Sequence, residues 1–412
     1  MESTLRHCQA FPDQNWKGAD FYPMNSHSRY VVQNCIKTID WNALQEYASR
    51  LHNGIKCLVL PGITNGQNHL VSVLEFENKT RWVARIQMYK STQRLAAELQ
   101  REVDVMALMR ERTKIPLPQV FGYEIDDNNQ TGVAFVLMEF LPDNVAMDAD
   151  GGYEAHRGQI PLQRRDGFYD STAHVQSSKQ VAGPDDVGPF AKDRDSFQEQ
   201  RRQLEAGPFP DIGGPFETAT AFFEAWAAHA SFPMSTTEIR ESMKNGPVDE
   251  VLMSITEFPL KVKEFASRLS SNDSGPFPVS HQDFLHSNII VNDRYRILGV
   301  IDWEGACTVP WELVEFPLFL STVPLPMDAP WNYDQDGEPL DEDTRQTWRE
   351  RKEYIERAVR FEIIEGIDDR LSATLNDQTL QNLAYAMRVY SEIGKLGFYH
   401  KVMEPFEKKH VL

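Results

Sequence analysis

The stretch His281-Gln282-Asp283-Phe284-Leu285-His286-Ser287-Asn288 is followed, fourteen positions after its last residue, by Asp302-Trp303-Glu304. Two short runs rich in β-branched residues lie between these pieces, at 289–291 and 297–301, and turn-prone residues separate the runs. This pattern predicts two strands joined as a hairpin. Because the strands of a hairpin run out and back, Asn288 and Asp302 are expected at the same end.

An amide oxygen and a carboxylate that meet in this way form an oxygen-ligand site suited to Mg²⁺. Asp283, on the loop just before Asn288, would face the same space as a carboxylate. A base near an acceptor hydroxyl, beside metal ligands and nucleotide phosphates, is the arrangement that phosphoryl transfer requires. Either motif alone could be no more than the solvated end of a hairpin, but their joint spacing favours a phosphotransfer site.

At these residues the chain resembles the aminoglycoside phosphotransferase-type, protein-kinase-like family, and its fungal members most. The resemblance covers about 40–140 and 207–320, and it is looser in the C-terminal helices. It is strongest at four segments: His281–Asn288, Gly299–Gly305, Trp311–Pro317 and Gly213–Phe216. The resemblance implies a two-lobed α+β protein-kinase-like fold, with a small antiparallel sheet lobe and a larger, mainly helical lobe.

The resemblance also implies roles for the motif residues. Asp283 would be the catalytic base, while Asn288 and Asp302 would bind the metal. His281 would brace the catalytic loop, and His286 would either orient an acceptor or brace the same loop. Protein kinases usually carry Arg beside the catalytic Asp; Gln282 stands there instead, which argues against a phosphorylation-regulated protein kinase.

A glycine-bearing segment, Pro61–His69, is predicted to join two strands and to bring backbone N–H groups close to phosphates. Its candidate nucleotide-binding residues are Gly62, Thr64, Asn65 and Gly66. These glycines could equally be ordinary turn residues. Their place at the start of the small lobe favours the nucleotide-binding interpretation.

Trp82-Val83-Ala84-Arg85-Ile86 occupies the place of the kinase V-A-I-K strand, with Arg85 where Lys is usual. Strand alternation places Trp82, Ala84 and Ile86 on one face and Val83, Arg85 and Gln87 on the other. A guanidinium can hold phosphate oxygens and a carboxylate together. The alternatives are that Arg85 is an exposed strand residue, or that Lys90 takes its role.

A helix predicted over 93–112 should supply the carboxylate partner of Arg85. Glu102 matches best by resemblance, and Glu98, one helical turn earlier, is the alternative. The strand Val136–Leu141 should bind adenine through backbone groups near Glu139 and Leu141, although the same residues suit a strand that is merely buried.

Composition narrows the possible partners. A formal net charge of −19 over 412 residues disfavours nucleic acid and anionic membranes as partners. No apolar run approaches the roughly 20 residues of a membrane span, and the first residues form no signal peptide. The four cysteines show no zinc or disulfide spacing, so a reducing, cytoplasmic compartment is expected. The oligomeric state is left open.

The domain organisation follows from the distribution of patterned segments. We predict an irregular leader over 1–39, a kinase-like N-lobe with a leading helix over 40–141, and a helical C-lobe over 142–412. Within the C-lobe, 144–212 is expected to be an irregular insertion, and 178–206 does not resemble what fungal relatives carry there. We also predict strands at 56–60, 69–77, 81–87, 120–124 and 132–140, and helices at 40–54, 217–230, 248–270, 341–366 and 378–404.

The sequence thus predicts an enzyme that uses ATP as co-substrate and Mg²⁺ to phosphorylate a hydroxyl group of a small-molecule acceptor. Two alternatives stay open: a nucleotide-binding pseudokinase that serves as a scaffold, and a protein kinase.

Overall fold

The computed structural model describes residues 18, 21–157, 159–181, 212, 216–243, 246–392 and 394–408. The chain divides into two compact units. The first, here called the sheet unit, contains Met1–Arg110, Ile115–Phe168 and His286–Glu304; the second, the helical unit, contains Glu111–Lys114, Tyr169–Leu285 and Gly305–Leu412. Residues 1–17, 19 and 20 of the predicted leader, most of 178–206 and the glycines of Gly213–Phe216 lie outside the described residues.

The sheet unit is built on an antiparallel sheet of five strands in the order β1-β2-β3-β5-β4. Their bounds are β1 (Cys57–Asn65), β2 (His69–Phe76), β3 (Arg81–Gln87), β4 (Val120–Glu124) and β5 (Phe135–Glu139). The helix α3 (Gln93–Arg112) enters between β3 and β4. The predicted order of strands with a helix after the third strand is therefore confirmed.

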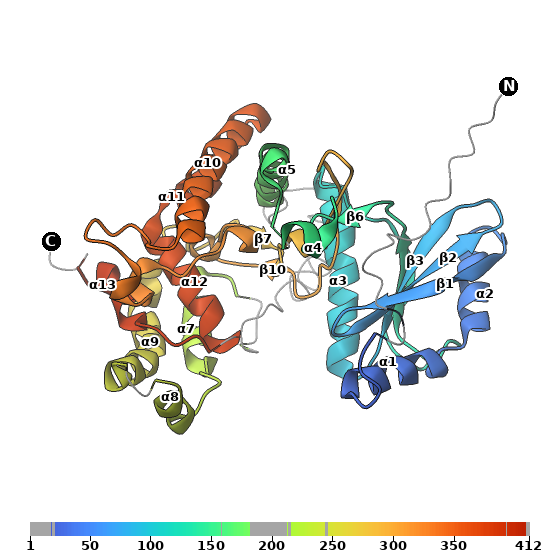
Figure 1. The fold of residues 1–412 in the computed structure, drawn as a ribbon, viewed down its shortest axis with the longest axis horizontal. Helices are drawn as coiled ribbons and strands as arrows, with labels where there is room; N and C mark the ends of the chain where they lie inside the picture. The colour runs from blue at the N-terminus through green and yellow to red at the C-terminus, as the bar shows by residue number, and fades with distance from the viewer. Residues whose placement is uncertain are drawn as a thin grey trace. The chain divides into compact units, whose positions relative to one another are not determined.

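Both faces of this sheet are covered. Side chains alternate along β3, so each face receives every second residue. Trp82, Ala84 and Ile86 are buried in a core with residues of α1 (His27–Thr38) and α2 (Trp41–Leu51). On the opposite face Val83 packs in a second cluster with α3 residues. Figure 1 shows α2 and α3 on opposite sides of this sheet. Arg85, two residues after Val83, therefore faces α3, as the alternation predicts.

A second, three-stranded sheet in this unit carries the predicted hairpin. It contains β6 (Asn144–Val145), β8 (Ile289–Val291) and β9 (Ile297–Val300), with β8 and β9 paired antiparallel. The turn is fixed by Asn292, whose side chain accepts the N–H groups of Arg294 and Arg296. The N–H of Ile301 donates to the carbonyl of Asn288 at 2.9 Å, so the two ends of the hairpin lie side by side as predicted.

The helical unit encloses a large aromatic and aliphatic core. Trp226, Phe258, Tyr390 and Tyr399 are in ring contact at its centre. Its helices are the larger part of α5 (Leu162–Val181), from Tyr169 on, with α7 (Ala219–His229), α8 (Thr236–Ser242), α9 (Val248–Leu269), α10 (Glu342–Glu365), α11 (Arg370–Asn376), α12 (Gln378–Glu392) and α13 (Tyr399–Lys408). A short two-stranded sheet pairs β7 (Val279–Ser280) with β10 (Cys307–Thr308). The α+β class is confirmed, with the sheet concentrated in one unit and the helices in the other.

Three expectations about elements were wrong. Residues 27–38 of the predicted leader form α1, because Ser26 caps its N-terminus and Val32 and Cys35 are buried against the sheet. Within the predicted insertion 144–212, residues 162–181 form α5. This helix buries aromatic and small side chains such as Phe168 and Ala173, so the aliphatic pattern that signals a helix is missing.

The third error is the single helix predicted over 378–404. The chain divides there into α12 and α13, and Gly394 between them adopts a left-handed φ of 64°. That backbone conformation suits glycine and ends a helix. Across the described ranges, none of the helices is long and apolar enough to cross a membrane.

Candidate functional site

Arg85 is the centre of an ion-pair network in the sheet unit. Its Nη1 donates to Glu102 of α3 at 2.5 Å, and its Nη2 donates to Asp302 at 2.7 Å and to Glu304 at 3.2 Å. The predicted contact between Arg85 and Glu102 is confirmed, and the alternatives Lys90 and Glu98 are not needed. Segments more than two hundred positions apart in the sequence thus meet at one guanidinium.

The charges of this network do not balance, because three carboxylates surround one cation. Burial opposes the charge of Arg85, yet Glu102, Asp302 and Glu304 outweigh it and raise the pKa of Arg85 above its ordinary value. Burial raises the pKa of Glu102 to about 7, and Asp302 and Glu304 add to that effect while Arg85 opposes it. The site therefore carries an excess of negative charge that a cation would relieve.

Glu304 extends the network to the turn between β1 and β2. Its Oε1 accepts the side-chain N–H of Asn68 at 3.3 Å, and its Oε2 lies 3.6 Å from Nδ1 of His69. Burial and the nearby Arg85 lower the pKa of His69 to about 2, so this ring is neutral near pH 7. Glu304 thus connects the end of the hairpin, where Asp302 lies, to the turn between β1 and β2.

Asp302 and Asn288 follow and precede the hairpin strands. Asn288 is buried in a short 3-10 helix, 286–288, and its carbonyl is held by the N–H of Ile301. Asp302 has a left-handed φ of 61°, a conformation that non-glycine residues adopt rarely and often at functional sites. An amide and a carboxylate at one hairpin end are the oxygen donors that Mg²⁺ takes from proteins, so these residues fit the ion.

The segment Pro61–His69 forms a much shorter turn than predicted. Gly62 and Thr64 lie within β1, which continues to Asn65, and a register shift between Val59 and Ile63 accommodates the glycine. The turn is closed by the N–H of Gly66, which donates to the carbonyl of His69. The buried Asn65 side chain donates to the Gly66 carbonyl and to the Tyr22 hydroxyl. Gly62 therefore serves the bulge of a strand, and the turn itself spans 66–68.

The predicted adenine segment is partly engaged in other contacts. The N–H of Glu139 donates to the carbonyl of Gln119, and the Glu139 carboxylate accepts the N–H of Gln119. The backbone N–H of Glu139 is therefore occupied by strand pairing, which was not foreseen. Leu141, two residues on, packs its side chain against Gly299 of β9.

The first part of the H-x-D-x-x-x-x-N motif, His281–Leu285, belongs to the helical unit. His281 follows β7, is buried and packs beside the Phe284 ring at 5.8 Å between centroids. Asp283 is exposed. His286 lies in the sheet unit, where its carbonyl accepts the N–H of Met147.

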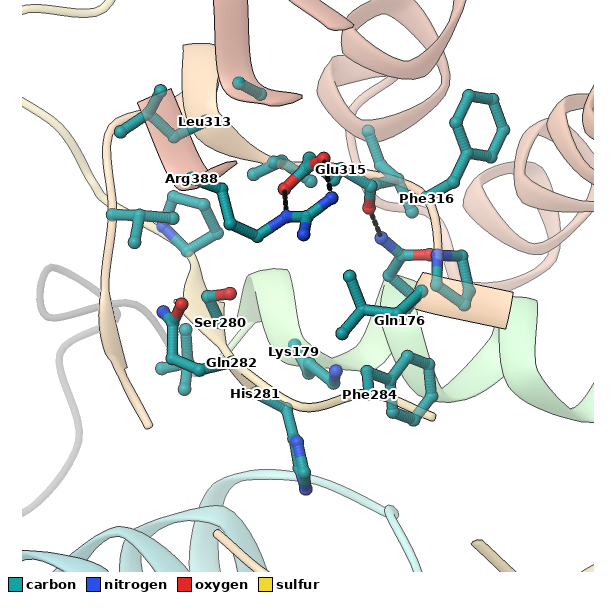
Figure 2. Close-up of a pocket in the computed structure, with 18 of the residues that line it drawn as sticks. Gln176, Lys179, Ser280, His281, Gln282, Phe284, Leu313, Glu315, Phe316 and Arg388 are labelled. Atoms are coloured by element: carbon teal, nitrogen blue, oxygen red, sulfur yellow. Dashed lines mark hydrogen bonds and ion pairs between the residues drawn. The ribbon is translucent and has the colours of Figure 1, made fainter. Parts of the chain in front are cut away.

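A cavity of about 70 Å³ in the helical unit is lined by this loop. Arg388 of α12 binds Glu315 through two nitrogens, at 2.6 and 3.2 Å, and Gln176 of α5 donates to the Glu315 carbonyl (Figure 2). The His281 ring points away from the Arg388–Glu315 pair. These polar contacts join α5, α12 and the segment after β10 behind the loop.

Lys179 of α5 also lines this cavity. Its Nζ lies 3.7 Å from the centroid of the Phe284 ring, within the range of a cation–π contact. Burial lowers the pKa of Lys179 to about 7.

Sequence reasoning did not identify Lys179, Glu315 or Arg388, because their contacts depend on segments distant in the chain. Glu304 was recognisable from the D-x-E spacing, but its bond to Arg85 was not.

A sequence model described as the phosphotransferase enzyme family matches residues 59–312, more than half of the chain. No match is found among curated proteins.

Three solved structures illustrate the wider similarity. Macrolide 2′-phosphotransferase type I shares 15% identity at a TM-score of 0.40, covering 88% of this chain and 96% of that one. Macrolide 2′-phosphotransferase MphH from Brachybacterium faecium shares 13% at 0.35, with the same coverage. Aminoglycoside phosphotransferase APH(4)-Ia shares 13% at 0.43, covering 89% and 97%.

Proposed function

Because this chain belongs to the phosphotransferase enzyme family, we propose that it transfers the γ-phosphoryl group of ATP to a hydroxyl group of a small molecule, with Mg²⁺. The observation that carries the proposal is the guanidinium of Arg85, held by Glu102 and in contact with Asp302. A cation placed between a helix carboxylate and a metal-binding carboxylate is what phosphoryl transfer uses to position nucleotide phosphates.

In this proposal each residue has one task. Arg85, fixed by Glu102, binds phosphate oxygens, and Asn288 and Asp302 hold Mg²⁺. When bound, Mg²⁺ neutralises charge on the β- and γ-phosphates. Asp283 accepts the proton of the acceptor hydroxyl and orients its oxygen. His281 keeps the loop that carries Asp283 in place.

Arg85 has to change partners during nucleotide binding. In the structure its Nη2 is shared between Asp302 and Glu304. Phosphate oxygens would compete with Asp302 for this nitrogen, which would release the carboxylate toward the metal. Glu304 would then keep Arg85 in place.

The test is a screen for ADP release from Mg·ATP with amino alcohols, sugars, amino acids and aminoglycosides as acceptors. Stimulation by at least one small hydroxyl compound, with a phosphorylated product, is the expected result. Nucleotide binding with no transfer to any acceptor would instead favour the scaffold alternative.

Two matched variants test the division of roles. Asp283→Asn keeps the shape of the side chain but removes the proton acceptor, so turnover should fall about 10²–10⁴-fold while Mg·ATP affinity is retained. Asp302→Asn removes a metal ligand charge and should weaken Mg·ATP binding as well as turnover. Identical losses of nucleotide affinity in both variants would contradict the assigned roles.

A further inference from the structure

The sheet unit contains a second cavity, of about 90 Å³, beside the Arg85–Glu102 pair. It lies where the start of β2 and the end of β3 meet α3. Polar groups from these elements line it: His69, Gln87, Tyr89, Glu98 and Glu304. A volume of this size holds several water molecules or one small ligand.

Gln87 contributes an acceptor that has no hydrogen bond within the described part of the chain. The residue is only 5% exposed, and its Oε1 is buried with no donor in range. Gln87 lies two residues after Arg85 on β3, so it faces α3 as Arg85 does. A buried acceptor without a donor costs free energy unless a ligand or water supplies one.

The surroundings of this acceptor are negatively charged. Glu98 and Glu304 line the cavity together with Glu102, whereas Arg85 is bound to carboxylates and Arg94 pairs with Glu98 on the outer side. His69 is neutral near pH 7 because burial, with Arg85, lowers its pKa to about 2. The cavity therefore offers acceptors and excess negative charge together.

We propose that this cavity binds a primary ammonium group, either the ammonium ion or the protonated amine of a small molecule. Such a group carries three or more N–H donors and one positive charge. It can donate to Gln87 Oε1 while it compensates the charge of Glu98 and Glu304. A water molecule would satisfy Gln87 but would leave the charge uncompensated.

A multivalent metal fits this cavity less well. Over the ranges that the structure covers, no group of three or more His, Cys, Asp or Glu side chains could hold a metal ion. Ammonium needs only hydrogen-bond acceptors, and Gln87 Oε1 with two carboxylates supplies them. Because Glu304 also accepts from Arg85, a cation here acts on the same carboxylate that positions the guanidinium.

The test is thermal unfolding at pH 7.5 and constant ionic strength with chlorides of four cations: ammonium, methylammonium, tetramethylammonium and sodium. Ammonium and methylammonium should raise the Tm saturably, by about 3 °C at tenfold excess over Kd. Tetramethylammonium, which has no N–H donor, and sodium should not. A shift with ammonium alone identifies the free ion as the ligand, whereas a shift with both identifies an amine head group. Equal shifts with all four cations would overturn the proposal.

Three variants locate the effect. Gln87→Leu should abolish the shift, and without added cation its Tm should equal or exceed that of the parent, because the buried acceptor is gone. Glu98→Gln should reduce the shift. Glu77→Gln, the same charge change at an exposed position, should leave it intact. An undiminished shift in Gln87→Leu would show that ammonium binds elsewhere.

Discussion

At the scale of single residues, the site depends on the geometry of one guanidinium. Arg85 uses Nη1 for Glu102 and Nη2 for both Asp302 and Glu304. The ammonium of Lys is one point charge at the end of a flexible chain, so it cannot reach these partners from two separate nitrogens. The arginine that stands in place of the usual lysine therefore contacts Glu304 in addition to Glu102 and Asp302.

Replacing Arg85 should weaken nucleotide use. Charge-assisted hydrogen bonds contribute about 1.5–3 kcal/mol each, so Arg85→Ala should raise the KM for ATP roughly 10–100-fold. Arg85→Lys keeps the charge and should retain much of the activity, within about tenfold of the parent. Steady-state kinetics over a range of ATP concentrations measure both effects. Parent-like behaviour of Arg85→Ala would remove Arg85 from the nucleotide site.

The pH dependence of the free energy of unfolding should show the cost of holding Glu304 as a buried carboxylate. Burial raises the pKa of Glu304 above its ordinary value of 4.5. The folded state therefore holds this proton more tightly than the unfolded state, and the Glu304 contribution to stability decreases as the pH rises above 4.5. Glu304→Gln, which does not ionise, should become more stable relative to the parent between pH 4.5 and pH 7.5.

Urea unfolding at both pH values measures this difference. His69 is present in both proteins, so its own titration largely cancels in the comparison. Glu77→Gln gives the background for loss of an exposed carboxylate. A variant whose stability relative to the parent falls with rising pH would show that Glu304 is stabilised as an anion instead.

At the scale of elements, the periodicity of the sequence predicted which face of a strand a residue lies on, but not which distant segments it contacts. The alternation along 82–87 correctly placed Arg85 on the face opposite Trp82. The choice of Glu102 as its partner came from the family resemblance, and the structure has this contact. Contacts from other segments were not predictable, because nothing near Asn68 or Gln87 in the sequence indicates that Glu304 will lie beside them. The same limit applies to α5, whose buried face is aromatic and small instead of aliphatic.

The hairpin strand β9 depends on a glycine for close packing. A Cβ on Gly299 would lie 2.1 Å from Cδ1 of Leu141, so that side chain would have to move. Gly299→Ala should lower the free energy of unfolding by about 1–3 kcal/mol, the usual cost of overpacking. Chemical denaturation measures the loss, and Gly299→Ala combined with Leu141→Ala should lose less than the sum of the single changes. Additive losses would mean that the two residues do not compete for space.

At the scale of the whole molecule, we expect the negative charge of the chain to make the proposed nucleotide binding depend on a cation. The chain carries a formal net charge of −19, and the Arg85 network adds three carboxylates where phosphates are proposed to bind. A nucleotide without metal would bring its own negative charge into this field.

The motif residues come from both units, His281–Leu285 from the helical unit and His286–Asn288 with Asp302 from the sheet unit. Nucleotide and metal binding can therefore be tested separately from the residues that act on the acceptor.

Removal of divalent metal should consequently abolish transfer and weaken nucleotide binding together. With Mg²⁺, ADP should bind at least about tenfold more tightly than in excess chelator, a difference of about 1.4 kcal/mol. Isothermal titration of ADP with and without Mg²⁺ measures this ratio, and ADP release from ATP measures turnover. Asp302→Asn should reduce the ratio toward one, whereas Asp283→Asn should leave it unchanged, because only Asp302 is assigned to the metal. Equal turnover in excess chelator and in Mg²⁺ would refute the assignment of Asn288 and Asp302 as metal ligands.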